Sequence, residues 1–273
     1  MKKNFISLYV FQVFKCLIYV LLTANIFFFY QEESLAVKST FSQGISITDI
    51  IQGFAATLDT DAWVMLLFLF ELNTSEYLKR LNSLNNAFIA KNFIRIFSYG
   101  LICYAFFGYL LKYILLINIE PFFIEDVCSL VDQGYYLIEN LDEYPLMTAS
   151  NCLALSNNPL FVLSGQAILG TKSDWQAIQN LGLVDIINSG TWILIVMIIE
   201  LEVLFGSKLL TTRLKFLNLK ILKTILYLIL FSAAAFWGFK GDFLEFWDAF
   251  LWLVAFFFIA VSYTHLTLPT MQV

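Results

Sequence analysis

The sequence predicts an all-α integral membrane protein with about six transmembrane helices and one partly helical extracytoplasmic loop domain. Of its 273 residues, 60% are hydrophobic and only 14% are charged. Long stretches with few charges, each about the ~20 residues that a helix needs to cross a bilayer core, occur at 8–30, 96–117, 217–239 and 243–260. The basic and the acidic residues lie mostly in different loops, which indicates how the chain is oriented in the membrane.

Basic residues cluster in three short segments. Eleven of the 16 Lys and Arg residues lie at 2–3, 79–95 and 208–223. The positive-inside rule places such segments in the cytoplasm. The stretch 118–184 instead carries eight acidic residues against Lys172 alone, so we expect it outside. The N-terminus is then cytoplasmic, and we expect a multi-pass protein of a bacterial-type inner (plasma) membrane.

The second span depends on this charge argument, because its clean apolar sequence covers only 62–70. Without a span there, the basic segment 79–95 would lie outside. We therefore predict a span at 54–73 and accept Asp59 and Asp61 near its outer end. The six predicted spans are 8–30, 54–73, 96–117, 185–205, 217–239 and 243–260.

The last residues, 261–273, differ from the rest of the chain. Residues 261–270 resemble the conceptual translation of a common transposon-based sequencing adapter. We predict that 261–273 are an adapter-derived artefact and that a natural C-terminus beyond about Ala260 is missing; the alternative is a natural polar tail. The other predicted units are 1–117 with three spans, the 118–184 loop domain and 185–260 with three spans.

Motifs for common enzyme chemistry are absent from the sequence. It contains no Gly-rich phosphate loop, C-x-x-C pair, H-E-x-x-H or G-x-S-x-G, and its one histidine is His265 in the predicted artefact. We therefore lean against an enzyme and predict no cofactor and no metal site. The basic segments are explained by topology and anionic lipids, so we predict no nucleic-acid binding.

A faint internal repeat points to an intramembrane polar centre. Trp63 and Trp192 are each followed eight residues later by Glu-Leu, at Glu71 and Glu200. A carboxylate at that depth costs ~2–3 kcal/mol, so it should face the bundle interior or a cation. With Lys15 as the natural partner, these glutamates form a predicted centre that binds or relays a cation or proton. The alternative is a structural ion pair, or side chains that snorkel to the interface.

The 118–184 loop is long enough to form a packed domain. Cys128 and Cys152 both lie in it, and an oxidising compartment favours a disulfide between them. The alternative is two unpaired thiols buried in helices. We read 123–144 as helical, and 174–183 as a helix that leads into the fourth span.

We expect the other polar and aromatic residues of the spans to have structural roles. We expect Asn25 and Gln12 to bridge neighbouring helices. Tryptophan is typical of membrane interfaces and lipid-facing surfaces, and we assign this role to Trp63, Trp237, Trp247 and Trp252.

Three functional hypotheses follow. The first is passage or coupling of a cation or proton through the bundle. The alternative is a non-catalytic membrane component whose extracytoplasmic domain binds a partner protein, and a membrane enzyme is third. The expected partners are the lipid bilayer and either another protein or a second copy of the chain.

The topology can be tested with reporter fusions. A reporter fused after Lys91 or Lys215 should be cytoplasmic, because these positions lie in basic segments. A reporter within 130–170 should be outside. Labelling of the 79–95 segment from outside would contradict the second predicted span.

Overall fold

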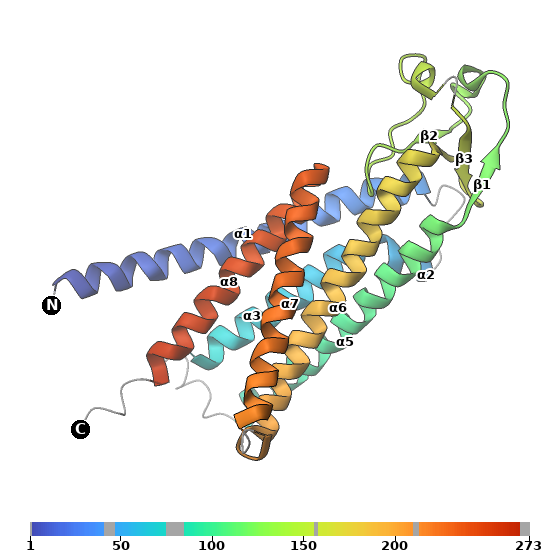
Figure 1. Cartoon of the computed structure of the whole chain (residues 1–273). Coiled ribbons are helices and arrows are strands. Elements are labelled where there is room, and N and C mark those ends of the chain that lie inside the picture. Colours follow the sequence, from blue (N-terminus) through green and yellow to red (C-terminus); the bar gives the residue numbers. More distant parts are fainter. Residues whose placement is uncertain (1, 41–46, 75–84, 156–157, 210–212, 268–273) are drawn as a thin grey trace, which may run out of the picture.

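The computed structural model describes residues 2–40, 47–74, 85–155, 158–209 and 213–267, with side chains for 10–40, 50–72, 89–155, 158–202 and 219–256. Most of this chain is helical (Figure 1). The helices are α1 (Lys2–Thr40), α2 (Ile47–Gly53), α3 (Ala55–Thr74), α5 (Asn85–Ile117), α6 (Lys172–Leu209), α7 (Arg213–Lys240) and α8 (Phe243–Thr267).

The long helices pack side by side and neighbours in the sequence run in alternating directions (Figure 1). α5 contacts α3 and α6, while α8 contacts α1 and α7. α5 also closely approaches α2, because a Cβ at Gly108 would lie 2.5 Å from the carbonyl oxygen of Ile51. A larger residue at Gly108 would push these two backbones apart.

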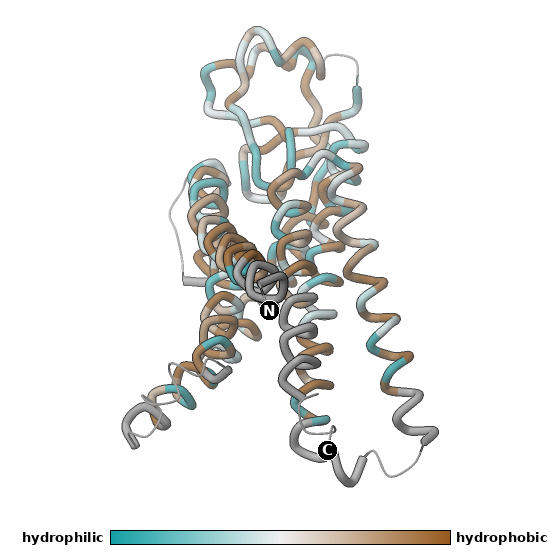
Figure 2. The backbone as a smooth tube through the Cα atoms, turned by 90° about the vertical axis from the view of Figure 1, so that its left-hand side faces the viewer, coloured by the Kyte–Doolittle hydropathy of each residue, from teal (hydrophilic) through white to brown (hydrophobic). Residues whose placement is uncertain are grey.

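Four helical segments are long and apolar enough to cross a membrane: Val10–Thr40, Ile89–Ile117, Lys172–Glu202 and Leu219–Lys240. Figure 2 shows hydrophobic positions along the lengths of these helices. The chain is therefore a multi-pass membrane protein by helix length and composition. The helices α3 and α8 occupy the second and sixth predicted spans, whose crossing stays a prediction. The basic positions 79 and 80, and the side chains of 208–215 and of the predicted artefact 261–273, lie outside the described residues.

A small β-sheet lies at one end of the bundle, next to the ends of α5 and α6 (Figure 1). We call residues 118–171 the sheet domain. Its strands β1 (Ile119–Phe122), β3 (Leu160–Leu163), β4 (Ile168–Thr171) and β2 (Tyr136–Leu137) are ordered β1-β3-β4-β2. The pairs β1-β3 and β3-β4 are antiparallel, and β2-β4 is parallel. Two 3₁₀ turns complete it, η2 (Val127–Leu130) and η3 (Cys152–Leu155).

The predicted helix at 123–144 is wrong. In its place the chain forms η2, a turn and β2. Asp132 and Gly134 have φ of 65° and 79°, which a right-handed helix does not allow. The pairing of β2 with β4 joins segments about 30 residues apart, so local periodicity did not reveal it.

The predicted helix at 174–183 is confirmed as the first part of α6. The start of α6 is capped locally, because Thr171 N donates to Asp174 Oδ2 at 2.8 Å and Asp174 N donates to Thr171 Oγ1 at 3.3 Å. This reciprocal arrangement is that of a capping box. Helix α6 therefore begins directly where strand β4 ends.

The sheet domain shares a hydrophobic core with the bundle. Trp175, Ile178 and Leu181 of α6 pack with Leu163 and Ile168 of the sheet, and with Trp237 and its neighbours on α7. The domain also has a core of its own around Met147 and Leu169. The sheet domain is therefore packed onto the bundle rather than tethered to it.

Three tryptophans expected at the membrane interface are instead buried. Trp63, Trp237 and Trp252 are 8%, 1% and 6% exposed. Trp63 and Trp252 belong to the main bundle core, and Trp247 packs at its edge. Their indole rings fill the spaces between helices, which corrects the lipid-facing interpretation.

The predicted disulfide is present, since Cys128 and Cys152 are bonded with Cα atoms 5.2 Å apart. It joins η2 to η3. The remaining cysteines, Cys16 and Cys103, are free and exposed on α1 and α5. The bond therefore closes the part of the sheet domain with the least regular structure.

Replacing both Cys128 and Cys152 with serine should destabilise the sheet domain by about 3 kcal/mol, because the bond closes a loop of 24 residues. Thermal unfolding and limited proteolysis in detergent measure this loss. The double variant of Cys16 and Cys103 is the control and should unfold as the native protein does. Equal stability of all three proteins would contradict the assignment.

Candidate functional site

The predicted partners Lys15 and Glu71 meet. Lys15 Nζ lies 2.5 Å from Glu71 Oε1, and the hydroxyl of Tyr19 donates to Glu71 Oε2 at 3.3 Å. The Lys15 side chain is only 10% exposed. This ion pair joins α1 to α3 at the end of the bundle opposite the sheet domain, which we call the far end.

Glu200 has other partners than Lys15. Its Oε1 accepts hydrogen bonds from Arg95 Nη2 and from the hydroxyl of Tyr99, the latter at 2.7 Å. Glu202, two residues on, pairs with Lys223 of α7 at 2.9 Å. Of the predicted centre, Lys15 and Glu71 are therefore in contact. The third member, Glu200, belongs to a separate cluster between α5 and α6.

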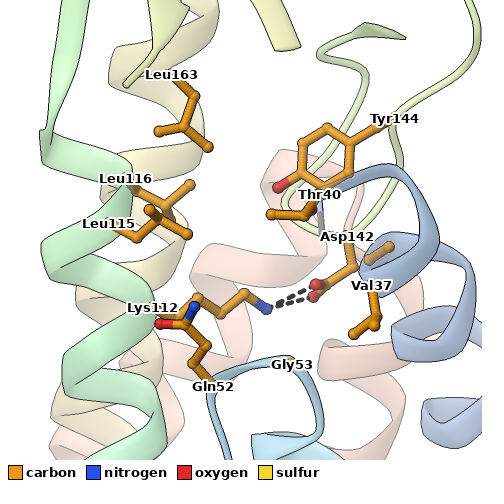
Figure 3. A pocket seen from close by; sticks show the side chains of 11 residues that line it. Val37, Thr40, Gln52, Gly53, Lys112, Leu115, Leu116, Asp142, Tyr144 and Leu163 are labelled. Atoms are coloured by element: carbon orange, nitrogen blue, oxygen red, sulfur yellow. Dashed lines mark hydrogen bonds and ion pairs between the residues drawn. The ribbon is translucent and has the colours of Figure 1, made fainter. Parts of the chain in front are cut away.

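Lys112, near the other end of α5, forms a buried ion pair with the sheet domain. Its Nζ lies 2.7 Å from both oxygens of Asp142, and both side chains are less than one-fifth exposed. Figure 3 shows this pair beside Tyr144, Thr40 and Gln52, around a small cavity at the junction of α1, α5 and the sheet domain. Burial raises the pKa of Tyr144 above its ordinary value, so its phenol stays neutral beside Asp142.

Glu33 of α1 caps the start of α3. Its carboxylate accepts from the backbone N–H groups of Ala56 and Thr57 at 2.8 and 3.0 Å, and from the Thr57 hydroxyl at 2.6 Å. The first N–H groups of a helix have no partner within it and carry partial positive charge. A carboxylate from another helix satisfies them here, which fixes α1 against α3.

A second small cavity lies deeper in the bundle, among α1, α3, α5, α6 and α8. We call it the acidic pocket. The space inside measures about 30 Å³, enough for about two water molecules. Its walls are Phe29, Asp59, Thr60, Trp63, Tyr109, Asn188, Trp192, Glu245, Asp248, Trp252 and Phe256.

Three carboxyl groups face this pocket, and no Lys or Arg is among the described residues that line it. Asp59 Oδ1 accepts from the indole of Trp63 at 2.9 Å. Asp248 Oδ1 accepts from the amide of Asn25 at 2.8 Å, which confirms that Asn25 bridges two helices. Gln12, expected to do the same, is exposed. Apolar surroundings disfavour the ionised form of a carboxyl group, so three that line one small cavity favour a bound proton or cation.

Two amide oxygens around the pocket lack a hydrogen-bond partner among the described residues. They are Oδ1 of Asn188 and Oδ1 of Asn25. Asn25 is 0% exposed. Buried amide oxygens nearly always accept a hydrogen bond, so these acceptors indicate a donor ligand or water.

The same spacing recurs on three helices that form the pocket. An Asp or Asn precedes a Trp by four residues at Asp59/Trp63 on α3, Asn188/Trp192 on α6 and Asp248/Trp252 on α8. Residues four apart lie on one helix face. Each helix therefore presents one oxygen and one indole to the same space.

The preceding helices repeat a second pattern. A basic residue is followed four residues later by tyrosine at Lys15/Tyr19 on α1, Arg95/Tyr99 on α5 and Lys223/Tyr227 on α7. In the first two, the base and the tyrosine hold one glutamate together, Glu71 or Glu200. These recurrences extend the predicted repeat from two units to three helix pairs.

The acidic pocket was not predicted from the sequence, although the sequence carries a signal for it. Asp59 lies in the second predicted span, and Glu245 and Asp248 lie in an otherwise apolar segment. The Asp/Asn-x₃-Trp spacing, read as one helix turn, groups Asp59 with Asp248 but does not include Glu245. Within the described ranges, no three His, Cys, Asp or Glu side chains are placed to hold a metal ion.

Comparison of the chain with protein families, with curated proteins and with solved structures found no match. The class of the protein therefore comes from its helices, which are those of a multi-pass membrane protein.

Asp242, in the turn between α7 and α8, provides a test by pH. Burial and the nearby Asp142 raise its pKa to about 6. Because the folded chain binds this proton more tightly than the unfolded chain does, stability falls as pH rises from about 4 to about 6. Asp242→Asn removes this effect while retaining an oxygen for the N–H of Glu245.

The expected result is that Asp242→Asn gains thermal stability relative to the native protein as pH rises through that window. Thermal unfolding in detergent at about pH 4 and about pH 7.5 measures the difference between the two proteins. A difference that does not change with pH would contradict the assignment.

Proposed function

We propose that this protein binds a cation or proton in the acidic pocket and passes it through the helical bundle. The observation that supports this most directly is the set of three carboxyl groups around one small cavity without a basic partner among the described lining residues. Such groups are costly inside a membrane protein unless they are paired, neutralised or hydrated, and a bound cation or proton is one way to achieve this. An ionisable cluster of this kind is typical of ion and proton pathways.

In this proposal α3 and α8 also cross the membrane, giving six spans in a bacterial-type inner membrane. The sorted basic charge of the sequence and the alternating direction of the helices (Figure 1) support this arrangement. The sheet domain is then extracytoplasmic, where a disulfide such as Cys128–Cys152 is stable.

The path has two polar ends and an apolar layer. Lys15 lies ten residues before Asn25 on α1, or ~15 Å along the helix axis. Between the acidic pocket and the Lys15–Glu71 pair lie buried Ile18, Leu22 and Leu67. A cation in the pocket is thus separated from the far end by packed side chains, and passage requires this layer to open.

A second candidate function is that of a membrane component whose sheet domain binds a partner protein. The observation that favours it is Phe123, which is 92% exposed on the sheet domain. Exposed large aromatic side chains are enriched at protein interfaces.

Flux measurements separate the two functions. Purified protein in liposomes should carry protons or monovalent cations down an imposed gradient, read with an internal pH dye and an internal potassium dye. Asp59→Asn should lower the rate by about tenfold or more, equivalent to ~1.4 kcal/mol, because the pocket loses one of its charges.

Asp61→Asn is the matched control, since Asp61 lies on the same helix two residues away and does not line the pocket. It should retain the native rate. Native protein that carries no more than empty liposomes would refute transport and favour the partner-binding function.

A further inference from the structure

The walls of the acidic pocket are mostly aromatic. Three indole rings line it, and the Trp63 centroid lies 6.0 Å from that of Trp192 and 6.3 Å from that of Trp252. The planes of these rings differ by 56° and 63°, so they form walls in different directions rather than one stack. Phe29, Tyr109 and Phe256 add three further rings.

This lining discriminates between kinds of cation. A small alkali ion with its high charge density requires oxygen ligands on most sides. An ammonium group is attracted both by carboxylates and by the faces of aromatic rings, of which indole is the most favourable. A lining of aromatic rings with a few carboxyl groups therefore suits an ammonium group better than an alkali ion.

The oxygens of the pocket match the hydrogen-bond donors of such a group. Asp59, Asn188 and Asp248 supply three acceptors from three helices at the same helical spacing. The Oδ1 of Asn188 has no partner among the described residues. A primary ammonium has three N–H donors and no acceptor, so it satisfies this arrangement where a bare proton would occupy only one oxygen.

The size of the pocket limits the ligand. The space of about 30 Å³ accommodates about two non-hydrogen atoms, as judged from the space that a water molecule requires. A tetraalkylammonium or a long amine is too large. Ammonium itself and methylammonium both fit.

We propose that the cation recognised by the acidic pocket is ammonium or a short primary alkylammonium. This inference rests on the proposed function, since it names the substrate class of the same site. The carboxylates supply the charge, the amide and carboxyl oxygens accept the N–H groups, and the indoles cover the remaining faces.

Intrinsic tryptophan fluorescence tests the proposal, because three of the six tryptophans line the pocket. The probes are ammonium chloride, methylammonium chloride, potassium chloride and tetramethylammonium chloride, added to the purified full chain in detergent at constant ionic strength. Ammonium and methylammonium should change the fluorescence saturably. Potassium and tetramethylammonium should do so only at concentrations about tenfold higher or more.

Variants locate the site. Trp192→Leu should weaken methylammonium binding about tenfold, whereas Trp192→Phe, which keeps a ring face, should weaken it less. Trp247→Leu is the matched control, because Trp247 lies on α8 outside the pocket lining and should leave binding unchanged. If Trp192→Leu fails to fold, Trp192→Phe and Trp252→Phe replace it. Both should bind methylammonium more weakly than the native protein does, whereas Trp247→Phe should bind it as tightly as the native protein does.

Equal binding of potassium and methylammonium, or equal loss in the Trp247 and Trp192 variants, would overturn the proposal. So would the absence of any saturable change with ammonium. The proposed function is judged separately, because proton or potassium flux that depends on Asp59 and not on Asp61 would persist in each of these outcomes.

Discussion

A charged side chain inside an apolar helical bundle must be paired, neutralised or hydrated, because moving a lone ion out of water costs several kcal/mol. The arrangement of this protein follows from how its buried charges meet that requirement. Glu33 is satisfied by the N-terminal N–H groups of α3. Lys112 is satisfied by Asp142, which is carried by the sheet domain. Each solution joins two parts of the chain that are distant in sequence.

These contacts divide the bundle into levels. The Lys112–Asp142 pair lies where the sheet domain meets the helices, the acidic pocket lies below it, and the Lys15 and Arg95 clusters lie at the far end. A buried ion pair contributes little net stability, but removing one partner leaves an uncompensated charge. The pairs at both ends therefore act mainly to hold the register of the helices around the pocket.

The recurrence of two spacings gives the pocket its internal similarity. A base and a tyrosine one turn apart on α1, α5 and α7 alternate with an Asp or Asn and a tryptophan one turn apart on α3, α6 and α8. The pattern favours a threefold repetition of a helix pair. One helix pair differs from the other two, because α6 has Asn188 where α3 and α8 have Asp. The pocket therefore has one carboxyl group fewer than a strict repetition would give it.

The sequence by itself determined the class of protein, the positions of the long helices, the Lys15–Glu71 partnership and the Cys128–Cys152 bond. Hydrophobic length and charge sign are local properties that can be read without knowing which helices are neighbours. The two pairings join distant residues, but few residues of the right type lie at the same depth or in the same loop. Tertiary structure alone decided the sheet, the partners of Glu200 and the gathering of Asp59, Glu245 and Asp248. Those outcomes depend on which helix faces are turned toward each other and on pairing between distant strands, and an apolar sequence with few polar markers leaves both open.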